Sequence, residues 1–196
     1  MNYLAHSFLS FSNEPILFGQ FIADDIKGSR WQEFPPEIRK GILLHRFIDD
    51  FTDNHPMVVK LRKCLHPRLG KFSGVALDVL FDHVLCIRWE NYEETSQADW
   101  IGLTYDLLAA RSPDMSEKRK FILANMIKHN WMQMYSTTEG ITTILHQMSR
   151  RIPFENPLEQ GVVAFEEHKN AIISTFDEFF PEIISVTQAK LDTFAP

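Results

Sequence analysis

Apolar side chains recur every three or four residues along most of the chain, which is the spacing of one face of an α-helix. No convincing run alternates between apolar and polar residues as a half-buried strand does. The sequence therefore predicts an all-α protein. Because 44% of its 196 residues are hydrophobic and no repeat or flexible linker interrupts them, we expect residues 1–196 to form a single compact multi-helix bundle.

Prolines, glycines and hydroxyl-bearing residues predict where the helices begin and end. We expect helices over about residues 14–28, 36–52, 56–65, 73–92, 97–111, 116–135, 138–151 and 158–192. The expected N-caps are Ser73, Ser116 and Thr138. Pro67 and Gly70 predict a loop, and Pro181 predicts a kink or a restart in the last helix.

Charge and cysteine content narrow the classes of function. The formal net charge of −6 argues against general binding of nucleic acid, which is itself a polyanion. Cys64 and Cys86 are far apart, which favours a reducing compartment. We find neither an apolar run of about 18 residues, as a membrane span needs, nor the basic start of a signal peptide. These features predict a cytoplasmic protein with no membrane or nucleic-acid partner.

One segment, residues 58–71, is basic and contains no acidic residue. Its positive side chains are Lys60, Arg62, Lys63, Arg68 and Lys71. Two interpretations remain open at this point: a solvated helix face followed by a loop, or a docking patch for an acidic partner.

The segment HRFIDDFTDNH, residues 45–55, places metal-capable groups among apolar ones. On a helix over 36–52, one face carries Ile38, Ile42, His45, Asp49 and Thr52. His45 and Asp49 then lie one turn apart on a face that its apolar neighbours turn inward. A buried aspartate is costly unless it is paired or coordinates a cation, so this face predicts either a metal site or a hydrogen-bonded core pair.

A second helix face repeats this arrangement with Val75, Asp78, Asp82, Leu85 and Trp89, and His83 lies about 100° round the helix. Two carboxylates one turn apart on an apolar face repel each other unless a cation is near. Two further candidates, His6 and Asp24, lie among apolar residues near the start of the chain. Carboxylates and imidazoles without thiols favour Mn²⁺, Mg²⁺, Fe²⁺ or Zn²⁺, which can activate water for hydrolysis.

Several motifs resemble the acyl carrier protein phosphodiesterase family. They are MNYLAH at the start, GQFIADDIKG at 19–28, FPPEIRKGILLHRFIDDFTDNHP at 34–56, GVALDVLFDHVL at 74–85, and Trp89. The likeness is specific over residues 1 to about 90, and beyond them it is reduced to helix pattern and size. It implies an all-helical, manganese-dependent relative of the HD-domain phosphohydrolases that removes the 4′-phosphopantetheine arm from holo acyl carrier protein.

The resemblance also implies roles for individual residues. The implied metal-site residues are His6, Asp24, His45, Asp49, Asp78, Asp82 and His83, and the implied catalytic residues are Asp24, His45, Arg46, Asp49 and His83. Arg46 and Thr52 would help to position the phosphate or the ligands, with Arg150 and Arg151 as weaker alternatives to Arg46. The order Asp82-His83 is the reverse of the usual His-Asp doublet, and Phe8 and Arg88 stand where relatives would carry histidine.

Because acyl carrier proteins are acidic, the resemblance gives the basic segment 58–71 a reason to act as a docking patch. The segment around His129, with Met126, Trp131, Met132 and Met134, predicts core filling or a groove for the pantetheine arm. Two other functions stay open. The substrate is a nucleotide or another small phosphodiester in the first, and the chain is a non-catalytic metal-binding protein in the second.

Overall fold

The computed structural model describes residues 1–194, and these residues form helices joined by turns and short loops, with no strand among them. The prediction of an all-α protein is therefore confirmed. The helices are α1 (Tyr3–Phe8), α2 (Glu14–Ile22), α3 (Pro36–Asn54), α4 (Pro56–Leu69), α5 (Ser73–Ile87), α6 (Gln97–Ala110), α7 (Glu117–His129), α8 (Trp131–Met134), α9 (Thr138–Arg150) and α10 (Gly161–Thr193). Within this part of the chain, no helix is both long and apolar enough to cross a membrane.

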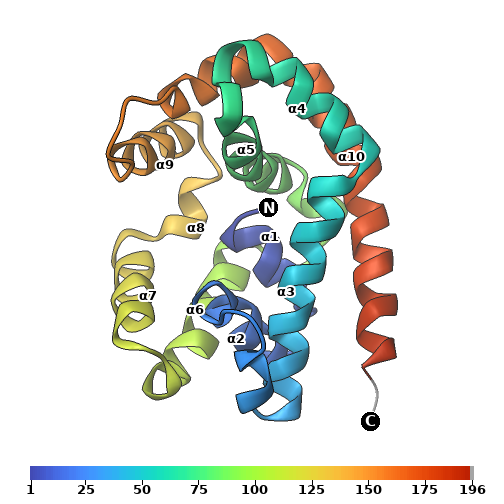
Figure 1. Ribbon diagram of the computed structural model, residues 1–196, viewed down its shortest axis with the longest axis vertical. Coiled ribbons are helices and arrows are strands. Elements are labelled where there is room, and N and C mark those ends of the chain that lie inside the picture. The colour runs from blue at the N-terminus through green and yellow to red at the C-terminus, as the bar shows by residue number, and fades with distance from the viewer. Residues whose placement is uncertain (195–196) are drawn as a thin grey trace.

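The short helix α1, which the residue pattern did not predict, lies in the middle of the molecule (Figure 1). The helices α2, α3 and α5 surround it, while α7, α8 and α9 form an arm on the other side (Figure 1). Leu4 and Ala5 of α1 are fully buried. The N-terminal residues are therefore part of the core, which places His6 inside the protein.

The helices α2 and α3 pack against each other through two glycines. A Cβ atom on Gly19 would collide with the carbonyl oxygen of Ile38, and one on Gly41 would collide with that of Ile16. Only glycine permits backbones to approach this closely. The contact places the end of α2, which leads into Asp24, beside the middle of α3, which carries His45.

Several predicted helix boundaries were wrong, each for a local reason. The first ends at Ile22, because a 3-10 turn, η1 (Ala23–Asp25), follows it. The helix α4 continues through Pro67 to Leu69, since buried Leu65 and Leu69 hold its last turn against the core, and it ends at Gly70, whose φ is +52°. The helix α7 ends at His129, because Asn130 adopts the left-handed conformation.

The predicted caps were correct in one case. Ser116 accepts a hydrogen bond from the Arg119 amide at 3.2 Å and so caps α7. Ser73 instead lies inside α5 and donates its hydroxyl to the Gly70 carbonyl, and Thr137, not Thr138, caps α9. In α10 the non-helical backbone lies at His168, while Pro181 is accommodated within the helix.

Candidate metal centre

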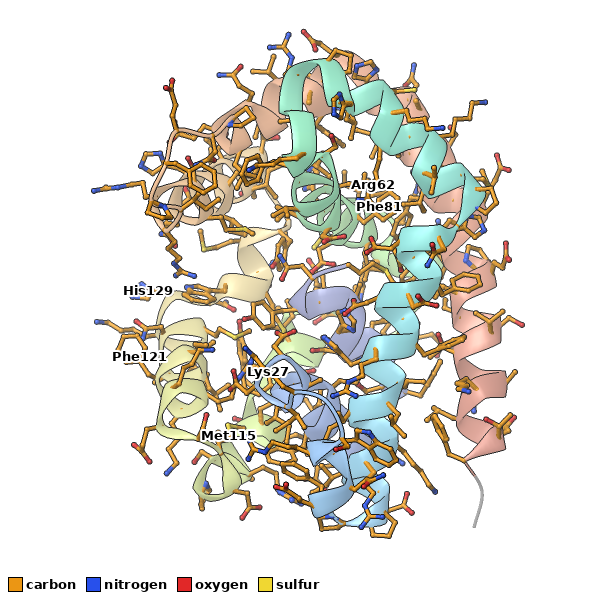
Figure 2. The ribbon with its side chains drawn as sticks, in the orientation of Figure 1. Lys27, Arg62, Phe81, Met115, Phe121 and His129 are labelled. Carbon is orange, nitrogen blue, oxygen red and sulfur yellow. The ribbon has the colours of Figure 1, made fainter. Side chains whose placement is uncertain are left out.

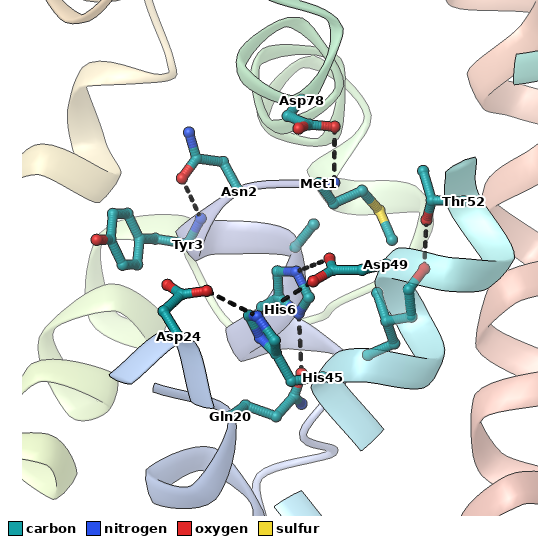
Figure 3. Close-up of polar contacts among 12 residues, drawn as sticks. Met1, Asn2, Tyr3, His6, Gln20, Asp24, His45, Asp49, Thr52 and Asp78 are labelled. Atoms are coloured by element: carbon teal, nitrogen blue, oxygen red, sulfur yellow. Dashed lines mark hydrogen bonds and ion pairs between the residues drawn. The ribbon is translucent and has the colours of Figure 1, made fainter. Parts of the chain in front are cut away.

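Two histidines and an aspartate converge from two helices, His6 from α1 and the other two residues from α3. The Nε2 atom of His6, on α1, lies 3.1 Å from Oδ1 of Asp49, and Nε2 of His45 lies 3.2 Å from Oδ2 of the same carboxylate (Figure 3). The two imidazole rings stack with their centroids 4.1 Å apart. One ligand atom from each of the three residues lies within 4.8 Å of the other two, so together they could hold a metal ion.

Asp24, in η1, extends this cluster. Its Oδ1 atom lies 3.2 Å from Nε2 of His45, so His45 faces two carboxylates at once. The hydrogen bond with His45 is the main cause that lowers the pKa of Asp24, and burial opposes it. Burial also opposes ionisation of Asp49, but the hydrogen bond and positive charge that protonated His6 and His45 would supply outweigh it, so the pKa of that carboxyl is lowered. Both carboxylates are therefore ionised at neutral pH.

A second layer of hydrogen bonds orients the His6 ring. Gln20 donates from Nε2 to Ser10 Oγ at 2.8 Å, so its Oε1 faces Nδ1 of His6 at 3.0 Å and accepts that proton. Burial, with the neighbouring His45, lowers the pKa of His6, which keeps the ring neutral at neutral pH. With its proton on Nδ1, His6 turns the lone pair of Nε2 toward the Asp49 carboxylate. The His6 nitrogen and the Asp49 oxygen are then both acceptors, and two acceptors this close favour a cation bound between them.

Arg119 is a site residue that the sequence analysis missed. It extends from α7 with its side chain only 2% exposed, and its Nε donates to Asp25 Oδ2 at 3.1 Å. Its Nη2 lies 3.7 Å from Asp24 Oδ2, and its guanidinium lies over the ring of Phe21. Arg119, Leu123 and Met126 follow steps of four and three, so the same stripe argument that found His45 would have found it.

The second predicted stripe lies beside α1, but its polar groups serve mainly to hold that helix. Both oxygens of Asp82 accept hydrogen bonds from α1 amides, at 3.2 Å from Asn2, 2.8 Å from Leu4 and 3.3 Å from Ala5. Burial raises the pKa of Asp82 to about 7. Asp78 Oδ1 accepts from the α-amino group of Met1 at 2.8 Å and borders the cavity at the histidine pair.

His83 and Arg46 also have other partners. His83 donates from Nδ1 to the Tyr135 carbonyl at 2.6 Å, and its ring packs on Phe165. Arg46 donates to the Ile26 and Gly28 carbonyls, at 2.6 and 3.0 Å, and so holds the loop after η1. The structure therefore brings His6, Asp24, His45 and Asp49 together, but it does not bring Asp82, His83 or Arg46 to them.

A cavity of about 350 Å³ opens over the histidine pair, and we call it the metal-centre cavity. Its polar lining includes His6, Asp24, His45, Asp49, Thr52 and Asp78. Thr52 uses its hydroxyl to donate to the Ile48 carbonyl at 2.7 Å (Figure 3). A cavity of this size, lined in part by carboxylates and imidazoles, can admit a phosphodiester beside a bound metal ion.

The basic segment lies on α4 and η3 (Gly70–Phe72). Arg62, labelled in Figure 2, pairs with Asp53 at 3.0 Å, and Arg68 pairs with Glu167. Lys60, Lys63 and Lys71 are exposed. The lysines therefore supply most of the positive charge that remains for a partner.

Comparison with known proteins agrees with the motifs of the N-terminal half. The family model described as acyl carrier protein phosphodiesterase matches residues 1–183. Proteins named acyl carrier protein phosphodiesterase are similar over 97% of this chain: those of Yersinia pestis and Enterobacter sp. (strain 638) are each 28% identical, and that of Salmonella agona (strain SL483) is 26% identical. The matches cover 99%, 98% and 99% of those proteins.

No solved structure matches the chain, so the expected likeness to HD-domain phosphohydrolases stays a prediction. The family match extends well past residue 90, where the recognisable motifs end. The helices α6 to α9 therefore belong to the same family unit as the histidine cluster. On the extent of this match, the chain belongs to the acyl carrier protein phosphodiesterase family.

Proposed function

We propose that this chain hydrolyses the phosphodiester that joins 4′-phosphopantetheine to a serine of holo acyl carrier protein, giving the apo protein. The observation that carries the proposal is the convergence of His6 and His45 on the Asp49 carboxylate, beside Asp24 and under an open cavity. Membership in the acyl carrier protein phosphodiesterase family indicates which substrate to propose. A buried hydrogen-bonded pair alone would need neither the second histidine nor the cavity.

We propose Mn²⁺ as the metal, with Mg²⁺ or Fe²⁺ as alternatives. The proposed ligands are His6, His45 and Asp49, and Asp24 is a candidate fourth. Imidazole with carboxylate and no thiol suits these ions. When bound, a divalent ion would polarise the phosphoryl group and increase the acidity of water.

The protein groups have distinct roles in this proposal. The oxygen of a water molecule forms a bond to phosphorus while the bond from phosphorus to the serine oxygen breaks. Asp24, ionised and 61% exposed, accepts the proton that the water loses, and the departing serine oxygen takes up a proton in turn. Asp24 lies 3.2 Å from Nε2 of His45, within reach of an ion held there, and Gln20 keeps His6 in the tautomer that leaves Nε2 free.

We further propose that the basic segment on α4 and η3 attracts the acidic carrier, mainly through Lys60, Lys63 and Lys71. A cytoplasmic location is supported by the two free thiols, Cys64 and Cys86. Reversing the charge of Lys60 and Lys63 is expected to weaken carrier binding more at low than at high salt.

Mass spectrometry of holo acyl carrier protein incubated with the chain and Mn²⁺ tests the proposal. We expect the wild type to remove the phosphopantetheine mass, and Asp24→Ala and Asp49→Ala to leave it in place. Asp50→Ala is the matched control, because Asp50 is exposed on the same helix as Asp49 and, among residues 1–194, its side chain bonds only Asn54. A carrier that keeps its arm with metal-loaded wild type would refute this function and favour a small phosphodiester or a non-catalytic metal protein.

A further inference from the structure

A second, larger groove lies between α7, α8 and α9. It measures about 660 Å³ and is lined by Phe121, Ile122, Asn125, Trp131, Met134 and Thr143, among others. Figure 2 marks Phe121 on α7 and His129 at the end of that helix. Phe121 is 71% exposed, which is unusual for a phenylalanine and indicates a surface that something apolar covers. We call this hollow the α7–α9 groove.

The α7–α9 groove and the metal-centre cavity both adjoin a third, smaller hollow. This hollow measures about 170 Å³, and it shares Asn2 and Tyr3 with the cavity and Tyr3, Trp131, Gln147 and Arg151 with the groove. Tyr3 borders all three spaces. Figure 3 shows its ring on the same side of the histidine pair as Asp24, directed away from the pair. A chain attached to a phosphate at the metal centre can therefore pass Tyr3 into the groove.

The lining of the groove and the smaller hollow favours an uncharged, elongated ligand. Its described side chains are aromatic, aliphatic, thioether, amide or hydroxyl groups with one histidine and one arginine, and none is a carboxylate. Asn125 and Gln147 offer amide donors and acceptors, while Trp131 and Met134 offer apolar surface. Sites of this volume and composition are typical of small-molecule binding.

We propose that the α7–α9 groove binds the pantetheine arm of the substrate, an inference that rests on the proposed function. The two amides of the arm pair with polar side chains such as Asn125 and Gln147. Its dimethyl group and terminal thiol contact Trp131 and Met134, where sulfur–aromatic contacts are favourable. The phosphate end stays at the histidine pair. The helices α7 to α9 thus bind the departing group, and α1 to α3 carry the chemistry.

The segment around His129 was predicted either to fill the core or to form a groove for the pantetheine arm, and its residues divide between core and groove. Met126 and Met132 are fully buried and fill the core, while Trp131 and Met134 line the groove. The sequence pattern mixes both sets because α7 ends at His129 and α8 begins at Trp131, after the left-handed Asn130 changes the direction of the chain.

Thr143 and Thr142 provide a matched pair of variants for the test. Both are exposed on α9, and both donate their hydroxyl to a carbonyl one turn earlier, but only Thr143 lines the groove. We expect Thr143→Trp to fill the groove. It should raise KM for holo carrier about tenfold with little change in kcat, and weaken the binding of free pantetheine, measured by calorimetry, by a similar factor. Thr142→Trp should match the wild type in both measurements.

A phosphodiester without the pantetheine arm tests the chemistry at the metal centre independently of binding in the α7–α9 groove. All three proteins should hydrolyse bis(4-nitrophenyl) phosphate at the same rate, which also shows that Thr143→Trp is folded. If the wild type fails on holo carrier, the proposed function fails. If the wild type succeeds and Thr143→Trp keeps the wild-type KM and pantetheine affinity, the groove inference alone is wrong. A raised KM with unchanged pantetheine affinity would also overturn it, because the groove would then contact the carrier protein.

Discussion

The hydrogen bond from His6 to Gln20 decides which nitrogen of His6 is available to a metal. Replacing Gln20 by leucine removes the acceptor at 3.0 Å from Nδ1, so the ring is free to place its proton on Nε2. We expect Gln20→Leu to weaken Mn²⁺ binding about 10- to 100-fold, measured by calorimetry. Ser10→Ala, which removes the acceptor that orients Gln20 and a hydrogen bond to the His6 carbonyl, should have a smaller effect because Gln20 remains. Equal Mn²⁺ affinity in Gln20→Leu and wild type would contradict binding through Nε2.

Asp82 predicts a pH dependence of stability with an unusual sign. Burial raises its pKa to about 7 in the folded chain, from an ordinary value of 3.8. Between these values the folded state holds a proton that the unfolded state has lost, so the contribution of Asp82 to the free energy of unfolding falls as the pH rises. Asp82→Asn keeps the shape but cannot ionise.

Urea unfolding at several pH values measures this effect. Between pH 4 and pH 7 we expect the free energy of unfolding of the wild type to fall relative to that of Asp82→Asn. Above pH 7 the difference between the two proteins should stay constant. Comparing the two proteins cancels the contributions of the other carboxylates. A constant difference across this range would show that Asp82 titrates near its ordinary value.

The close contact between α2 and α3 sets the distance between Asp24 and His45, so its effect on stability can be tested. A Cβ on Gly41 meets the Ile16 carbonyl, whereas one on Gly102, in α6, meets no atom of the described residues within 4 Å. We expect Gly41→Ala to lower the free energy of unfolding by about 1–3 kcal/mol, the usual cost of overpacking. Gly102→Ala, the control, should raise it by about 0.5–1 kcal/mol because alanine favours helix. Urea unfolding that ranks the two variants the other way would contradict this packing.

The site residues that could be predicted from the sequence are those whose partner lies on the same helix. His45 and Asp49 are one turn apart, so their shared face follows from helix geometry alone. The Asp78–Asp82 face was equally visible, yet the partners of Asp82 are amides of α1, 77 to 80 residues away in the chain. A single helix pattern shows which residues face inward, but it cannot show what they face.

Across the whole molecule, the site depends on segments that lie far apart in the chain. Its N-terminal part was visible through the motifs MNYLAH and HRFIDDFTDNH. The contribution of α7 to α9 was not visible, because Arg119 reaches Asp25 across 94 positions and the α7–α9 groove exists only when three helices meet. Long-range placement of this kind follows from tertiary packing, which no local pattern encodes.

Arg119 therefore tests whether α7 positions the catalytic turn. The Asp25 carboxylate has two cationic partners from α7: Arg119, 2% exposed, at 3.1 Å, and Lys118, 72% exposed, at 2.9 Å. Breaking a buried pair leaves an uncompensated charge, while an exposed pair contributes little. We expect Arg119→Gln to lower the free energy of unfolding by about 3 kcal/mol, and Lys118→Gln to change it by less than about 1 kcal/mol.

Kinetics then separates a positioning role from a purely structural one. Because η1 carries both Asp24 and Asp25, loosening it should lower kcat on holo carrier in Arg119→Gln while KM stays near the wild-type value, since the α7–α9 groove is untouched. Arg119→Lys, which keeps one charged donor, should recover part of the kcat. If Arg119→Gln unfolds more easily but turns over at the wild-type rate at low temperature, the arginine serves only to hold α7 against the core.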